Sequence, residues 1–392
     1  MKTFFKYHLL SILTALFLCI CCFFIVLKYK LFVKENLKTT IIKGEKNSQQ
    51  GFLANLLAGD SSEIDFVGSL KEKNGITLLG SSEITGDFQF MPNRFLPQQF
   101  GIRVNSYGHA YQQCFAIYTQ LLALKKELKD SKICIILSPG WFEQGGTNIE
   151  AFLEFARPNF LRKIIKDETI SIEDKEYIGA FIEGNYENIE NPSKELNFFY
   201  NIFKYKDIFL LNSFFQAKSL EIENVEYQVK TTVSKKIPKI NYNWDSLIEI
   251  YRTKFIHSIK SNKKFIVDSY FLEYIKQKDG SIMTTEFLKR DVSNNQELKD
   301  FKKLVQLLKD NNVDASFVLQ QLNPFHYKKL SSFDHFAHEI DMTLKKNKFP
   351  FLNKFESDKA KFEPAVLNDI MHFGEVGWLE IDKFLLKNYS ND

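Results

Sequence analysis

Side chains that could support acyl transfer occur in two short segments far apart in the chain. Ser82 lies in Gly80-Ser81-Ser82-Glu83, and Asp369 precedes His372 by three residues near the C-terminus. This spacing would place both side chains on one side of a single helical turn. A carboxylate that accepts from one imidazole nitrogen leaves the other free to take a proton from a serine hydroxyl. Each motif alone is common by chance, as a turn or as a helix-cap Asp beside an unrelated His.

The elements around these segments place both at positions suited to chemistry. Residues 75–79 are a short apolar, β-prone run that stops at Gly80, typical of a buried strand ending in a tight turn. In an open parallel sheet, chemistry lies beyond the C-terminal ends of the strands. The Ser82 hydroxyl could project there, and the backbone N–H groups of Ser82 and Glu83 could help to stabilise an oxyanion.

The remaining pattern alternates between helices and strands. Apolar positions recur at helical spacing over 110–129, 295–310, 334–346 and 375–388, and short apolar runs at 131–137 and 315–320 predict strands. This alternation predicts an α/β fold with a parallel sheet covered by helices on both faces. Residues from about 145 to 290 are less regular, and we interpret them as an inserted, mostly helical subregion rather than a separate domain.

The N-terminus contains a candidate membrane anchor. The 19 residues from Leu9 to Leu27 carry no charge, and as a helix they would span the hydrocarbon core of a bilayer. A cleavable signal peptide is the alternative, but no small-x-small cleavage site follows. We therefore predict an anchor at 1–30, a stalk at 31–70 and a globular domain at 71–392. Long domains translocate largely regardless of flanking charge, and we expect this one on the extracytoplasmic side.

Composition and the remaining motifs argue against several other functions. The net charge is only +4, with Lys and Glu interspersed, so no nucleic-acid partner is expected. Three of the five cysteines lie in the apolar run, so no disulfide framework is implied. His335 and His338 are only two possible ligands and make no metal site, and Gly145-Gly146-Thr147 lacks the Lys of a phosphate loop. We expect no metal and no cofactor.

Together these segments resemble the SGNH/GDSL hydrolases and, more closely, the DltD family of D-alanyl-lipoteichoic acid biosynthesis proteins. Counterparts of the Gly-Ser-Ser-Glu turn, of Ser138-Pro139-Gly140-Trp141-Phe142 and of the ending Asp369-Ile-Met-His372-Phe-Gly occur in that family. The family also joins an N-terminal membrane anchor to an extracytoplasmic SGNH-like domain. The resemblance extends over nearly the whole chain.

The resemblance implies a role for each candidate catalytic residue. Ser82 holds the third place of Gly-Asp-Ser and becomes the nucleophile, with Ser81 as the alternative. His372 becomes the general base and acid, and Asp369 orients it. Oxyanion donors are expected at the backbone of Ser82 and Glu83 and near Gly108, although residues 105–109 depart from the family's Gly-rich, Gln-containing pattern.

One departure from ordinary GDSL esterases bears on the reaction. Their Gly-x-Asn-Asp block is absent, and Trp141 and Phe142 occupy its approximate place as candidate pocket residues. This difference favours a specialised acyltransferase over a general esterase. Two alternatives stay open: an envelope esterase or thioesterase, in which water replaces the acceptor, and a non-catalytic scaffold for a membrane-bound O-acyltransferase.

The resemblance also implies the substrate and the partners. Ser82 would accept D-alanine as an ester and pass it to a hydroxyl of an envelope polymer such as teichoic acid. A membrane-bound O-acyltransferase and a D-alanyl carrier protein are the implied partners. Each transferred D-alanyl ester would add a cationic amine to an anionic polymer.

Overall fold

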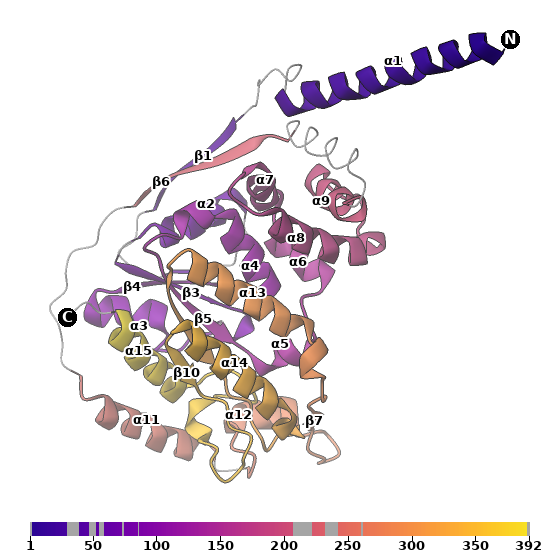
Figure 1. Cartoon of the computed structure of the whole chain (residues 1–392). Coiled ribbons are helices and arrows are strands. Elements are labelled where there is room, and N and C mark those ends of the chain that lie inside the picture. The colour runs from indigo at the N-terminus through magenta and orange to yellow at the C-terminus, as the bar shows by residue number, and fades with distance from the viewer. Residues whose placement is uncertain are drawn as a thin grey trace. The chain divides into compact units, whose positions relative to one another are not determined.

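A computed structural model of the chain describes residues 2–29, 39–46, 52–54, 59–72, 74–84, 86–206, 222–231, 242–259 and 262–389 (Figure 1). The chain forms two compact units. The smaller comprises residues 1–41 and 158–226, and the larger comprises residues 42–157 and 227–392. Each unit is described by itself below.

A six-stranded parallel sheet forms the centre of the larger unit. Its strands, in spatial order, are β10 (Phe351–Asn353), β8 (Asp314–Leu319), β5 (Lys132–Leu137), β3 (Gly75–Gly80), β4 (Arg103–Gly108) and β2 (Phe52–Ala54). β3 pairs with both β4 and β5, and Leu78 lies opposite Ser106 and Cys134. Strands buried on both faces need apolar residues at most successive positions, which explains the largely apolar run that ends at Gly80.

Helices cover both faces of this sheet. Ile76, Leu78 and Cys134 belong to one buried cluster with Trp378 and Leu379 of α15 (Glu375–Tyr389). Alternate strand residues point to the opposite face, where the ring of Phe317 contacts Phe301 of α13 (Gln296–Asp310). The predicted α/β class with helices flanking a parallel sheet is therefore confirmed.

The other elements complete the two units. The larger unit also contains α2 (Gly59–Leu70), α3 (Pro92–Phe100), α4 (Cys114–Ala123), α5 (Pro139–Gln144), α6 (Ile149–Phe155), α11 (Trp244–Ser258), α12 (Asp268–Tyr270), α14 (Asp334–Asn347), β7 (Thr285–Glu286) and β9 (Tyr327–Lys328). The smaller unit contains α1 (Lys2–Tyr29), α7 (Pro158–Lys166), α8 (Ile172–Asn185) and α9 (Lys194–Lys204). Two further strands, β1 (Thr39–Lys46) and β6 (Asn224–Thr231), each run across a boundary between the units.

The predicted strands and late helices agree with the structure to within a few residues. The predicted helix at 110–129 is too long, because α4 begins at Cys114 and ends at Ala123, before a separate 3₁₀ turn at Lys125–Glu127. Tyr111 has φ 70°, a left-handed conformation that ends regular structure before the helix.

The expected stalk and insertion differ from the structure in extent. β2 is part of the central sheet, and α2 buries Phe66, Val67 and Leu70, so residues predicted as stalk contribute to the globular core. Residues 30–38, 47–51 and 55–58 lie outside the described part. The region 145–290 is mostly helical where described, but it is divided between the units: α7, α8, α9 and the start of β6 belong to the smaller unit, whereas α6, α11, α12 and β7 belong to the larger one.

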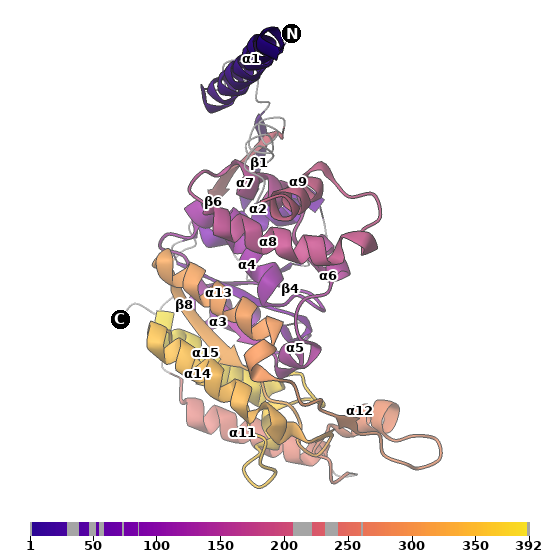
Figure 2. The same cartoon turned by 45° about the vertical axis from the view of Figure 1, so that its right-hand side comes forward.

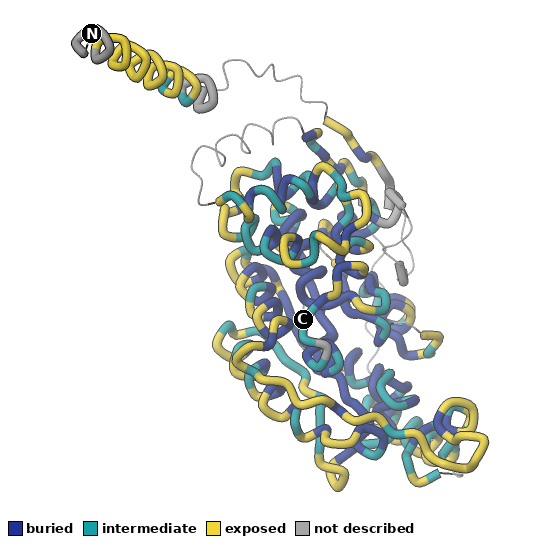
Figure 3. The backbone as a smooth tube through the Cα atoms, turned by 90° about the vertical axis from the view of Figure 1, so that its right-hand side faces the viewer, coloured by how far each residue is buried: buried dark blue, intermediate teal, exposed yellow. Residues whose placement is uncertain are grey.

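Helix α1 has the properties of a membrane-spanning segment. Its window Tyr7–Phe24 has a mean hydropathy of 2.2 and is the one stretch of described chain that is long and apolar enough to cross a bilayer. Figure 3 colours most of the described residues along α1 as exposed. Exposed apolar residues over this length are expected where lipid, rather than protein, surrounds the helix.

Candidate active site

The serine turn lies at the end of the central strand β3. Gly80 is the last strand residue, and after Ser81 the chain forms a 3₁₀ turn at Ser82–Ile84. The chain leaves β3 toward β4 on one side, whereas it leaves β5 toward β8 on the other. The C-terminal ends of β3 and β5 therefore meet at the topological switch point, where open α/β sheets bind their ligands.

Internal hydrogen bonds hold this turn, and its two serines differ in exposure. Glu83 Oε1 accepts from the Ser81 backbone amide at 2.5 Å, and the Ser81 hydroxyl donates to the His109 carbonyl at 3.0 Å. Ser81 is buried, whereas Ser82 is partly exposed. The Ser81 side chain is thus committed to holding the turn against the end of β4, and Ser82 is the better placed of the two to meet a substrate.

Gly108 has a structural reason to be glycine. It lies opposite Gly80 in the β3–β4 register, and a Cβ at this position would lie 2.4 Å from the Gly80 carbonyl oxygen. Any side chain here would force the two strands apart directly beneath the serine turn. Gly108 therefore lies next to the serine turn, and the close approach of β3 and β4 explains why this position is a glycine.

Asp369 and His372 form the expected contact, but not on a helix. They lie in a loop closed by an antiparallel bridge between Leu367 and Phe373 and by a 2.9 Å bond from the Asn368 amide to the His372 carbonyl. Asp369 Oδ1 accepts from the amides of Met371 and His372, both at 2.8 Å. The prediction of a helical turn is wrong, because the Asp side chain caps amides two and three residues ahead and so favours a local turn.

The second Asp369 oxygen completes the pair. Oδ2 lies 2.8 Å from His372 Nδ1, which fixes the ring and directs Nε2 away from the carboxylate. Asp369 is 8% exposed at its side chain and His372 is 31% exposed. A shielded carboxylate behind a more accessible imidazole is the arrangement that a serine general base requires.

Two residues that sequence reasoning missed position this loop. Gln320 follows β8 and donates through Nε2 to the Met371 carbonyl. The Asn323 amide donates to the Ile370 carbonyl at 2.9 Å. Both side chains are buried. The signal available in the sequence was that both are polar residues within four positions of the end of a buried strand.

The charges of Glu83 and His372 interact with each other, which indicates that the serine turn and the Asp369–His372 loop approach one another. Burial lowers the pKa of His372, but the hydrogen bond and charge of Asp369, and the charge of Glu83, together raise it above its usual range. Burial raises the pKa of Asp369, but hydrogen bonds and charge from His372 outweigh this effect and lower it. Burial raises the pKa of Glu83 to about 7, against the lowering effects of the Ser81 and Glu83 amides and of His372. The serine turn therefore lies within electrostatic reach of the imidazole.

The aromatic candidates belong mostly to the core. The Phe142 ring is fully buried against Phe301, Phe333 and Phe336. It therefore lines no open pocket. Trp141 is also buried, in the first turn of α5 after β5. Aromatic residues at strand ends pack here as they do in most hydrophobic cores.

Other chemistry has little support in the described residues. No group of three His, Cys, Asp or Glu side chains in them could hold a metal. Burial raises the pKa of Cys134 to about 12 and that of Cys114 well above its usual range. Neither thiol is therefore a nucleophile at neutral pH.

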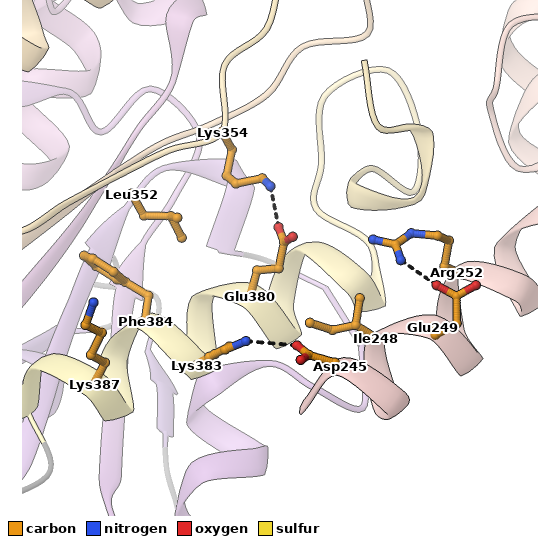
Figure 4. Close-up of a pocket in the computed structure, with 10 residues that line it drawn as sticks. All are labelled: Asp245, Ile248, Glu249, Arg252, Leu352, Lys354, Glu380, Lys383, Phe384 and Lys387. Atoms are coloured by element: carbon orange, nitrogen blue, oxygen red, sulfur yellow. Dashed lines mark hydrogen bonds and ion pairs between the residues drawn. The ribbon is translucent and has the colours of Figure 1, made fainter. Parts of the chain in front are cut away.

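A groove of about 580 Å³ lies elsewhere in the larger unit, between α11, α15 and β10 (Figure 4). Ile248, Leu352 and Phe384 are its apolar residues. Several of the charged side chains around it pair with one another, among them Lys354 with Glu380 at 2.6 Å and Lys383 with Asp245 at 3.1 Å. It contains none of the candidate catalytic residues, so its size does not make it the active site.

Comparison with known proteins identifies the family. The family model described as DltD protein matches residues 67–390, a range that begins in α2 and includes the serine turn and the Asp369–His372 loop. No curated protein sequence matches the chain. Because the family match covers most of the chain, this protein belongs to the DltD family, whose members take part in the D-alanylation of teichoic acids.

Proposed function

We propose that the chain is a serine acyltransferase that carries D-alanine as an ester on Ser82 and transfers it to a hydroxyl of an envelope polymer such as teichoic acid. The observation that carries this proposal is the 2.8 Å contact between Asp369 Oδ2 and His372 Nδ1, within electrostatic reach of the turn that bears Ser82. Membership of the DltD family supports D-alanine as the acyl group and teichoic acid as the acceptor.

The proposed reaction has two similar halves. Ser82 Oγ attacks the carbonyl carbon of the D-alanyl donor while His372 Nε2 takes the hydroxyl proton and then gives it to the leaving group. In the second half, an acceptor hydroxyl attacks the Ser82 ester, and His372 moves the proton from that hydroxyl back to Ser82. Asp369 stays ionised throughout and stabilises the imidazolium that forms in each half.

The local structure favours this assignment of roles. Asp369 Oδ1 is held by two amides, so Oδ2 keeps its orientation when His372 changes charge. The Ser81 amide already donates to the Glu83 carboxylate. The backbone amides that follow Ser81 and those at the end of β4 are therefore the remaining candidates for an oxyanion hole. Serine dependence and an SGNH-like arrangement are thus parts of the proposal that rest on this geometry.

The proposed location follows from α1 and the family. We propose that α1 anchors the chain in the cell membrane with the globular part on the extracytoplasmic side. There it would receive D-alanine through a membrane-bound O-acyltransferase supplied by a D-alanyl carrier protein. The apolar window Tyr7–Phe24 supports an anchor, and family membership supports the pathway.

Active-site labelling tests the proposal. The detergent-solubilised full chain is treated with a fluorophosphonate, digested and analysed by mass spectrometry to identify the modified serine. We expect the adduct on Ser82, loss of labelling in Ser82→Ala and His372→Ala, and retained labelling in Ser81→Ala. An adduct on Ser81, or labelling that survives His372→Ala, would refute the assigned roles.

A further inference from the structure

The side chain of Glu375 joins the two ends of the candidate site. Glu375 is the first residue of α15 and follows His372 by three residues. Its carboxylate oxygens accept from two successive backbone amides, Oε1 from Gln89 at 3.2 Å and Oε2 from Phe90 at 3.1 Å. These amides lead into α3, which lies beside α15 in two views of the larger unit (Figure 1 and Figure 2). One side chain therefore connects the segment after the serine turn to the segment after His372.

The backbone of Glu375 is fixed to the loop that carries His372. The Gly374 amide, directly before α15, donates to the Val366 carbonyl at 2.9 Å. A Cβ on Gly377 would lie 2.5 Å from the Val366 carbonyl oxygen, so the first turn of α15 packs closely against the base of the loop. Any displacement of Glu375 is therefore transmitted to His372.

The amides that Glu375 binds are packed together with the serine turn. Ile84, the last residue of that turn, is fully buried in one apolar cluster with Phe90 and with Phe373, the residue after His372. Apolar contacts are non-directional. The cluster thus keeps the serine turn and the histidine close together without fixing their relative orientation.

The carboxylate supplies the direction that the apolar cluster lacks. A hydrogen bond with an ionised acceptor is stronger than a neutral one, and two parallel bonds to one carboxylate add geometric specificity. Transfer of a proton from a serine to an imidazole requires this precision, because a misplacement of about 1 Å can slow a reaction about 100-fold.

We propose that Glu375 is a positioning residue that fixes the orientation of the Ser82 hydroxyl relative to His372 Nε2. This inference rests on the proposed serine mechanism and adds a residue beyond those that perform the chemistry. Glu375 touches no reacting atom in this role and acts through the two amides that it binds. The alternative role is purely electrostatic, because an acidic side chain in the first turn of a helix interacts favourably with the helix dipole.

Three substitutions at this position separate the two roles. Glu375→Asp keeps the negative charge in the first turn of α15, but its side chain is one methylene shorter and no longer reaches both amides. Glu375→Gln loses the charge and keeps the reach, with one oxygen still able to accept. Glu375→Ala loses both. A role through the helix dipole predicts that Asp behaves like the wild type and Gln like Ala.

The rate of fluorophosphonate labelling of Ser82 measures the effect in the detergent-solubilised full chain. We expect the maximal rate constant to fall about 10- to 100-fold in Glu375→Asp and Glu375→Ala, and by less in Glu375→Gln. The final extent of labelling counts the folded protein, so a folding defect lowers the extent, whereas misplacement lowers the rate constant.

The pH dependence and a control on the same helix test whether the effect is one of position. The contact between Asp369 and His372 is retained in each variant, so the acid limb of the labelling rate should stay at the pH of the wild type. Glu380→Gln removes a different charged contact of α15, the salt bridge with Lys354, and should label within about two-fold of the wild-type rate, well short of the loss expected from misplacement.

Several results would overturn this inference. They are a wild-type rate in Glu375→Asp, a displaced acid limb, or an equal loss of rate in Glu380→Gln. His372→Ala, assayed in parallel, reports on the serine mechanism itself, and labelling of this variant at the wild-type rate would refute that mechanism. Loss of labelling in His372→Ala together with wild-type rates in Glu375→Asp and Glu375→Ala would refute only the role of Glu375.

Discussion

Replacing Asp369 with Asn should disable the general base while leaving its loop folded. The Asn Oδ1 can still accept from the amides of Met371 and His372, which lie at 2.8 Å in the wild type. In the wild type, Asp369 Oδ2 lies 2.8 Å from His372 Nδ1. In the variant, the NH₂ group of the Asn side chain takes the place of this oxygen. Because the amide is a donor there, Nδ1 must become the acceptor and Nε2 must carry the proton.

The size of the effect follows from two losses. A hydrogen bond to a charged group contributes about 1.5–3 kcal/mol, and its loss alone would slow the reaction about 10- to 150-fold. The side chain of Asp369 is only 8% exposed, so water replaces little of this stabilisation. The inverted tautomer also removes the base, and the same substitution in a serine-protease triad lowers kcat about 10⁴-fold. We expect a loss of about 10³- to 10⁴-fold.

The rate of fluorophosphonate labelling as a function of pH measures this effect. Only neutral His372 can accept the Ser82 proton, so labelling of the wild type should fall as pH drops through the raised pKa of His372. Without the Asp369 charge that pKa falls, and the acid limb of Asp369→Asn should move to lower pH as the maximal rate falls. Asp279→Asn is the matched control, because Asp279 makes a similar cap on an exposed loop. An unchanged rate, or an acid limb at the same pH, would refute the reasoning.

Three further predictions concern the serine turn and its support. The pKa of Glu83 is raised from its ordinary 4.5 to about 7, so the folded state binds the Glu83 proton more tightly than the unfolded state does. The resulting stability is complete below about pH 4.5 and is lost as pH rises through 7, a change of about 3 kcal/mol. As the pH rises from 4 to 8, the Tm of Glu83→Gln should therefore rise relative to the Tm of the wild type. A Tm difference that does not change with pH would contradict this. Gly108→Ala should lower stability by about 1–3 kcal/mol, because its Cβ would meet the Gly80 carbonyl oxygen at 2.4 Å. A Cβ added at Gly184 in α8 would have no heavy atom within 4 Å, so Gly184→Ala should instead raise the free energy of unfolding by about 0.5–1 kcal/mol. Equal effects of the two substitutions in thermal unfolding would argue against the close approach of Gly108 to Gly80. Ser81→Ala loses one hydrogen bond, to the His109 carbonyl, and should cost about 1 kcal/mol while the maximal labelling rate of Ser82 stays within a few-fold of the wild type.

The sequence was informative where the physical constraint was local. β3, β5 and β8 are buried on both faces, so each appears as a largely apolar run, interrupted by Thr77 in β3 and by Ser316 in β8. β4 was missed because it carries Arg103 and Asn105, which are buried only because both bond to Glu72. Hydrophobic periodicity within β4 cannot reveal this pairing, because the partner, Glu72, follows helix α2.

The candidate site shows the same division. The spacing of Asp369 and His372 predicted their contact, but capping by the Asp side chain produced a loop in place of a helical turn. The positions of Gln320 and Asn323 beneath that loop depend on where β8 ends in the folded sheet. Glu83 was visible as a neighbour of Ser82, whereas its raised pKa arises from burial that only the tertiary structure creates.

The account depends most directly on Ser82 as the acyl carrier. In cells that lack the wild-type protein, mass spectrometry would measure ester-linked D-alanine in the envelope after expression of either the wild type or Ser82→Ala at equal membrane levels. We predict that the wild type restores D-alanylation and that Ser82→Ala does not. Full restoration by Ser82→Ala would contradict the acyl-serine mechanism and would favour a non-catalytic scaffold.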